Sequence, residues 1–157
     1  MRAGALGELG LALGGVIAAV AMLGGCRHLG LQPHPLRIAH EEVTTSTGVR
    51  WEDLFRGKGP AAQSGDELLL DYTLWLVEGK RVDSTLDRGL PITSRIGATF
   101  VPGLSDGLIG IQPDGQRRIV VPPKLGYGDK GVEGLIPPNA TLVFEVHAIE
   151  VHVHAGK

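Results

Sequence analysis

The spacing of prolines and glycines in residues 120–146 constrains the fold of this chain more than any other feature. Pro122 and Pro123 end an apolar run, because proline has no backbone N–H for a sheet ladder and disfavours helix in the residue before it. A tight, exposed loop is therefore predicted after them, and it contains glycines at positions 126, 128, 131 and 134.

A strand is predicted after this loop, and the two together suggest a binding site. Leu142, Phe144 and Val146 alternate with other side chains from position 141 onward, which is the period of a half-buried strand. The loop therefore holds Tyr127 and Ile136 beside a sheet. An aromatic hydroxyl next to branched aliphatic side chains suits a shallow apolar pocket with one hydrogen-bonding group.

Residues 126–131 also match G-x-G-x-x-G, the pattern of dinucleotide-binding loops. That pattern binds a nucleotide only where a strand precedes it and a helix begins within it. Prolines precede this segment, and further glycines and prolines follow it, so no helix is expected to start there. Nucleotide binding is not predicted.

Composition excludes several classes of protein. The 157 residues have a formal net charge of −2, and the longest basic cluster is Arg117-Arg118, so a nucleic-acid partner is not expected. The 24 glycines, 10 prolines and 4% aromatic residues favour a turn-rich sheet protein. A single cysteine excludes an internal disulfide and a multi-cysteine zinc site. His152 and His154 would share a strand face, but terminal histidines are usually solvated, so neither a metal nor a cofactor is expected.

The cysteine, Cys26, follows an uncharged apolar stretch over residues 9–25. This layout is typical of a secretory signal, and the LGGC at residues 23–26 resembles a bacterial lipobox. We therefore predict a lipoprotein signal peptide at 1–25 and lipidation of Cys26. A plain signal or an uncleaved anchor is the alternative, although seventeen helical residues span only about 26 Å of a hydrocarbon core of about 30 Å.

Three segments are expected along the chain: the signal, a flexible tether at 26–47 and a folded domain at 48–153. Alternation is clearest in residues 67–77, where Leu68, Leu70, Tyr72, Leu74 and Leu76 share one face. The only predicted helix spans 102–109. The fold class is therefore α+β, with an antiparallel sheet of five or six strands and one short helix. The other predicted strands lie near 49–54, 80–84, 91–96 and 117–121 and from 141 onward.

Six motifs in a fixed order resemble those of FKBP-type peptidyl-prolyl cis-trans isomerases, over residues 48–152. They are LDYT at 70–73, GKRVDS at 79–84, FVPGL at 100–104, GQRR at 115–118, YG at 127–128 and IPPNATLVF at 136–144. The resemblance implies an antiparallel sheet wrapped around one short helix. It also implies an apolar pocket between helix and sheet that accepts a prolyl ring.

The resemblance assigns roles to individual residues of this chain. Tyr72, Asp83 and Tyr127 would be catalytic: Tyr127 would donate its hydroxyl to a substrate carbonyl, and Asp83 would hydrogen-bond Tyr72 close to the twisting amide. The backbone N–H of Val101 would hold a second carbonyl. The substrate-binding residues implied are Val82, Ile92, Phe100, Val101, Leu104, Ile136 and Phe144.

The implied function is an extracytoplasmic, membrane-anchored isomerase on the periplasmic side, acting on X-Pro bonds of exported proteins and binding FK506-type macrolides. Val82, Ile92 and Leu104 depart from the family, because each stands where an aromatic residue is common. A proline-binding or chaperone-like envelope lipoprotein with weak or no turnover is therefore a second hypothesis, and a structural envelope lipoprotein is a third. On local grounds alone, Asp83 before Ser84 also fits a simple turn.

Overall fold

The computed structural model describes residues 41–154. The predicted signal peptide at 1–25, the predicted lipidation site Cys26 and the part of the predicted tether up to residue 40 lie outside these residues. Within the described part of the chain, no helix has both the length and the apolar character needed to span a membrane.

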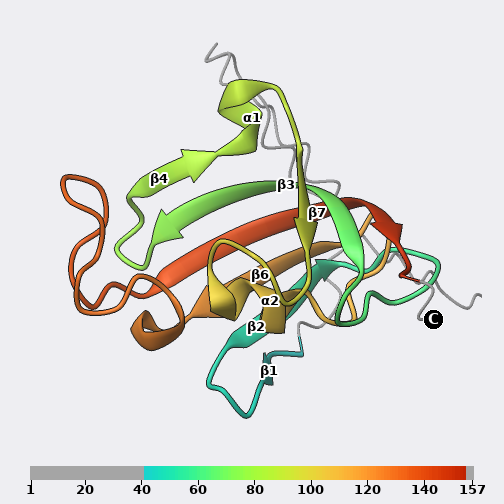
Figure 1. Ribbon diagram of the computed structural model, residues 1–157, viewed down its shortest axis with the longest axis horizontal. Coiled ribbons are helices and arrows are strands. Elements are labelled where there is room, and N and C mark those ends of the chain that lie inside the picture. Colours follow the sequence, from blue (N-terminus) through green and yellow to red (C-terminus); the bar gives the residue numbers. More distant parts are fainter. Residues whose placement is uncertain (1–40, 155–157) are drawn as a thin grey trace, which may run out of the picture. The chain divides into compact units, whose positions relative to one another are not determined.

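Strands β3 (Glu67–Leu76) and β7 (Leu142–His152) form the centre of the sheet. They pair antiparallel along nearly their whole length (Figure 1). Alternate side chains of each strand face the core, so Leu68 and Leu70 of β3 and Phe144 of β7 are fully buried. The predicted two-residue period is confirmed in both strands.

All strand pairs are antiparallel, in the order β1-β2-β6-β7-β3-β4, with β5 also on β3. The predicted class, α+β with an antiparallel sheet, is confirmed, and the described residues form seven strands instead of five or six. The remaining strands are β1 (Val43–Thr44), β2 (Arg50–Phe55), β4 (Arg81–Ser84), β5 (Ile92–Arg95) and β6 (Gln116–Val121).

The extra strand, β1, lies in the segment predicted to be a tether, so the end of that segment is corrected. Val43 and Thr44 pair with Trp51 and Arg50. The turn between the strands is closed by Thr45, whose side-chain oxygen accepts from the Val49 N–H at 3.0 Å. A two-residue strand shows no periodicity, which is why the sequence pattern does not reveal it.

Helix α2 (Pro102–Leu108) lies against one face of the sheet (Figure 1) and matches the predicted helix to within one residue. Its residues Leu104 and Leu108 are fully buried. Gly107 permits the close approach, because a Cβ there would lie 2.3 Å from a side-chain carbon of Ile119 on β6. The helix therefore packs directly on the sheet beside the predicted pocket.

Two short helical turns were not predicted: α1 (Thr85–Arg88) and the 3-10 turn η1 (Pro123–Leu125). Ser84 caps α1 by accepting from the Leu86 N–H at 3.3 Å. Gly89 ends it in the left-handed conformation, with a φ of 66°. Four residues are too few to show helical periodicity, but they fold the chain back over β3.

The predicted tight loop after β6 is present and is internally hydrogen-bonded. Val132 and Ile136 exchange two backbone hydrogen bonds, both of 2.8 Å. Gly131 has a φ of 60°, and a Cβ there would lie 2.2 Å from the Ile136 carbonyl oxygen. Residues 126–131 open no helix, in contrast to a dinucleotide-binding loop.

Candidate active site

Three aromatic rings from separate elements meet beside α2. Tyr72 comes from β3, Phe144 from β7, and Phe100 from the segment leading into α2. The ring centroids of Tyr72 and Phe100 are 5.5 Å apart, and each lies 6.1 Å from that of Phe144. Phe144 is fully buried, whereas Phe100 is 47% exposed, so the cluster runs from the core to the surface.

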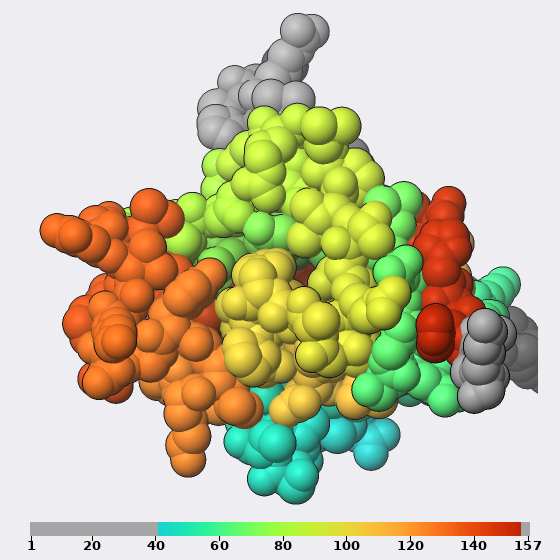
Figure 2. Space-filling view, in the orientation of Figure 1, coloured from blue at the N-terminus to red at the C-terminus, as the bar shows by residue number. Residues whose placement is uncertain are grey.

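A recess opens over this aromatic cluster. Figure 2 shows it between the yellow residues around α2 and the yellow-green residues of β4 and α1, with red atoms of β7 at its bottom. Val101, Leu104 and Ile136 are buried in the surrounding core. The partly buried residues of the predicted pocket that pack against this core are Val82, Ile92 and Tyr127.

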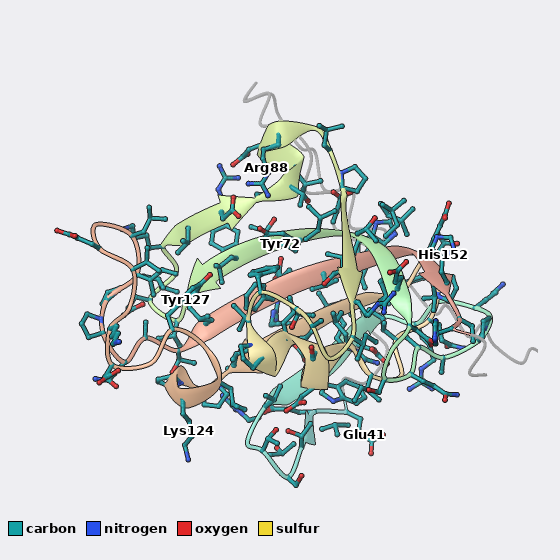
Figure 3. The ribbon with its side chains drawn as sticks, viewed as in Figure 1. Glu41, Tyr72, Arg88, Lys124, Tyr127 and His152 are labelled. Atoms are coloured by element: carbon teal, nitrogen blue, oxygen red, sulfur yellow. The ribbon has the colours of Figure 1, made fainter. Side chains whose placement is uncertain are left out.

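A hydrogen-bonded network joins the aromatic cluster to β4 and α1. The Tyr72 hydroxyl donates to Asp83 Oδ2, and Arg88 Nη1 donates to Asp83 Oδ1. Arg88 Nη2 also donates to the Tyr72 hydroxyl at 3.3 Å, and its guanidinium lies 6.0 Å from the Tyr72 ring centroid. Figure 3 shows Arg88 reaching from α1 toward Tyr72 on β3.

This network sets the protonation of both groups that meet in it. Desolvation raises the pKa of Asp83, but the hydrogen bonds from Tyr72 and Arg88 and the Arg88 charge outweigh it, so the net pKa is lowered. Burial and the bond to Asp83 raise the pKa of Tyr72. Asp83 is therefore a carboxylate at neutral pH, and Tyr72 remains a phenol.

A second layer of polar contacts holds α1 on β3. Thr85 is fully buried and donates its hydroxyl to Asp71 Oδ1 at 2.6 Å. The backbone N–H of Tyr72 donates to the Thr85 hydroxyl at 3.0 Å, and the Thr73 and Ser84 hydroxyls are 3.0 Å apart. These bonds fix the turn that carries Asp83, so its carboxylate has a defined position.

Tyr127 differs from Tyr72 because its hydroxyl forms no hydrogen bond within residues 41–154. Burial raises the pKa of Tyr127, with a smaller contribution from the Asp83 charge, so the hydroxyl stays protonated. The preceding turn is closed by a 2.9 Å bond from the Gly128 N–H to the Pro123 carbonyl. Tyr127 therefore presents a donor that an incoming carbonyl can accept.

Arg88 is the residue at this site that the sequence analysis missed. The sequence feature that could have revealed Arg88 is the segment STLDRG at 84–89, in which a capping serine and a terminal glycine enclose one helical turn. Arg88 is five residues from Asp83, and that turn brings their side chains together. No periodic pattern reveals so short an element.

The described residues hold no cluster of three or more histidine, cysteine, aspartate and glutamate side chains arranged to bind a metal. His152 forms a pair with Glu150 at 3.1 Å, and the His154 N–H donates to Asp66 at 2.7 Å. The chemistry of the site itself is that of apolar walls, a phenol donor and a fixed carboxylate. Such a site binds and orients a small apolar ring bearing carbonyls.

The fold is an α+β domain with an aromatic recess between helix and sheet, and comparison with known proteins identifies its family. Residues 59–149 match the family model described as FKBP-type peptidyl-prolyl cis-trans isomerase. The chain therefore belongs to the FKBP-type peptidyl-prolyl cis-trans isomerases, as the ordered motifs predicted. Proteins of this family bind proline-containing chains and FK506-type ligands.

Curated relatives agree with this assignment. An FK506-binding protein of Neisseria meningitidis serogroup A is 41% identical over 102 residues, which are 64% of this chain and 94% of that protein. The FKBP-type peptidyl-prolyl cis-trans isomerase FkpA of Escherichia coli K12 is 40% identical over 108 residues, or 69% of this chain. These residues cover only 39% of FkpA.

Solved structures show the same fold. The crystal structure of Escherichia coli FkpA has a TM-score of 0.65 and 39% identity, covering 71% of this chain and 51% of that one. The crystal structure of AtFKBP13 has a TM-score of 0.63 and 33% identity, covering 70% of this chain and 98% of that one.

Proposed function

We propose that the recess over Tyr72, Phe100 and Phe144 binds the prolyl ring of a polypeptide and that X-Pro rotation is catalysed there. The observation that carries this proposal is the Tyr127 hydroxyl, which has no hydrogen-bond partner among the described residues and lies near the aromatic cluster bonded to Asp83. The ring would lie among six apolar side chains: Val82, Ile92, Phe100, Leu104, Ile136 and Phe144.

Non-covalent catalysis suits these groups. Rotation about an amide bond crosses a barrier of about 18–20 kcal/mol because it breaks amide resonance. Each preference of about 1.4 kcal/mol for the twisted amide over the planar one accelerates rotation tenfold. In this proposal Tyr127 and the Val101 N–H hold the two carbonyls that flank the bond. Asp83 stabilises the carbonyl carbon as resonance is lost.

A peptide relaxation assay tests the catalytic role. The full chain is added to a short X-Pro peptide, and the cis-to-trans rate is compared with the uncatalysed rate. We expect acceleration that falls about tenfold or more in Tyr127→Phe, since a hydrogen bond to a carbonyl is lost where resonance breaks. A folded wild-type chain whose rate equals the uncatalysed rate contradicts the proposal.

A binding module with weak turnover is the second candidate, and Val82 is the observation that favours it. This partly buried side chain packs against the core where an aromatic ring would add contact to proline. Aromatic contacts contribute about 0.5–1.5 kcal/mol beyond their area, so Val82→Phe should raise kcat/KM about two- to tenfold. If the wild-type chain binds the peptide without accelerating its isomerisation, and the Val82→Phe variant does accelerate it, the binding module is supported.

We infer further that the chain acts outside the cytoplasm, on exported proteins, with a lipid on Cys26 as its membrane anchor. The support is the apolar stretch before LGGC in the sequence. The test is metabolic lipid labelling of the wild type and of Cys26→Ala. The Cys26→Ala variant is expected to lose the lipid label and to leave the membrane fraction. Labelling of this variant at the wild-type level would reject Cys26 as the anchor.

A further inference from the structure

A second hollow lies beside the proposed prolyl site, between the β3–β4 turn and the loop after Tyr127. It has a volume of about 400 Å³, and its walls include Lys80 from the turn and Lys130, Val132, Leu135 and Ile136 from the loop. Figure 2 shows the yellow-green turn and the orange loop side by side. Ile136 lines this hollow and also belongs to the proposed prolyl site, so the two places are neighbours.

The charged side chains around this hollow form no ion pairs within the described part of the chain. Lys80, Lys130 and Glu133 are exposed, and none of them forms an ion pair with another residue in the 41–154 range. By contrast, the exposed Arg50 and Arg95 each pair with a carboxylate at 2.8 Å. Two cations and one anion leave the hollow with one net positive charge.

Backbone hydrogen bonds hold both lysines in defined places. The Leu76 N–H donates to the Lys80 carbonyl at 2.8 Å, which closes the β3–β4 turn. The Gly131 N–H, next to Lys130, donates to the Tyr127 carbonyl at 3.2 Å. The backbone positions from which the two lysine side chains extend are therefore fixed on the two sides of the hollow.

We propose that this hollow is a specificity subsite that selects substrates with an acidic residue near the proline. The inference rests on the proposed function: a chain with its prolyl ring over Phe144 leaves the site past Ile136 and enters the hollow. Val132 and Leu135 contact the chain there, and Lys80 and Lys130 attract an aspartate or glutamate two or three residues from the proline. The negative charge of Glu133 repels an acidic residue and therefore reduces this preference.

The expected preference is moderate. Exposed ion pairs are individually weak, so a glutamate should raise kcat/KM about threefold over a lysine at the same peptide position. Screening should remove the difference at about 1 M salt, where the Debye length falls to about 3 Å.

The experiment compares three X-Pro peptides that carry Glu, Gln or Lys at one position, placed two or three residues before or after the proline. Relaxation rates and equilibrium binding are measured with the full chain at low and high salt. The double variant Lys80→Gln/Lys130→Gln should bring the Glu-to-Lys ratio to about one and leave the Gln peptide unchanged. Glu133→Gln should increase the ratio, and Lys58→Gln, on the distant β2–β3 loop, is the matched control.

The outcomes separate this inference from the proposed function. Binding that prefers the Glu peptide without any acceleration supports the subsite and rejects catalysis. Equal values for Glu and Lys peptides at every position, or a preference that survives the double variant, overturn the subsite even if all three peptides are isomerised. Absence of both binding and acceleration for all three peptides overturns both proposals.

Discussion

Within residues 41–154, two arginine–aspartate pairs lie next to an aromatic ring, and they differ in burial. Arg117 donates Nε to Asp53 at 2.7 Å, and its guanidinium lies 3.7 Å from the Trp51 ring centroid. The Arg117 side chain is 2% exposed. At the proposed site, Arg88 donates to Asp83, but these side chains are 48% and 36% exposed.

The partners of each pair show what it does. Arg117 Nη1 also donates to the carbonyls of Gly107 and Ile109, both at 2.8 Å, so it binds the end of α2 to the sheet. Desolvation lowers the pKa of Arg117 despite its bond to Asp53, whereas the bond to Asp83 raises the pKa of Arg88. The first pair stabilises the fold, and the second orients polar groups at the solvent-exposed edge of the recess.

The largest expected effect tests the buried pair. Arg117→Met should reduce the free energy of unfolding by about 3–5 kcal/mol, because Asp53 loses a buried cation and two carbonyls lose their donor. Urea denaturation monitored by tryptophan fluorescence measures the change. Molecules that remain folded should keep near-normal isomerase rates.

The same substitution at Arg88 is the matched control for stability. Solvent and salt screen an exposed pair, so Arg88→Met should move the urea midpoint far less than Arg117→Met does. Equal losses of stability in the two variants would show that burial does not distinguish the pairs.

The second prediction concerns activity. Asp83→Asn keeps the shape of the side chain but removes the charge that accepts from Tyr72 and Arg88. Because hydrogen bonds to charged groups contribute about 1.5–3 kcal/mol, kcat/KM should fall about tenfold or more while the urea midpoint barely moves. Asp87→Asn is the control, since Asp87 lies on the same turn and pairs with Arg81 at 3.1 Å. Similar rates for the two variants would contradict a role for Asp83.

Local patterns predicted the elements that are long or strongly punctuated. The ten residues of β3 and eleven of β7 alternate over enough positions to reveal their buried faces. The prolines and glycines around Tyr127 likewise predicted the loop, since these residues act through their own backbone geometry. In each case the signal lies within the segment itself.

Local sequence patterns of this kind do not predict the two arginine–aspartate pairs. Arg117 and Asp53 are 64 positions apart and meet only because β2 pairs with β6. Arg88 reaches Asp83 because Ser84 and Gly89 bracket a single helical turn. Both contacts form only in the folded chain. The family resemblance predicted a role for Asp83, but it did not predict Arg88.

The smallest expected effect is on pH dependence. The pKa of Asp83 is lowered, so its contribution is complete above the ordinary carboxyl pKa of about 3.9 and is lost only as pH falls through the lower, folded-state value. The pKa values of Tyr72 and Tyr127 are raised above about 10, so both phenols stay protonated through neutral and mildly alkaline pH. The relaxation rate should therefore be constant between about pH 5 and pH 9.

Arg88→Met removes one cause of the lowered pKa of Asp83, so the pH at which the rate begins to fall in acid should rise in this variant. Arg117→Met should leave that pH unchanged. An inflection near pH 6 or 7 in the wild type would mean that another group controls the site.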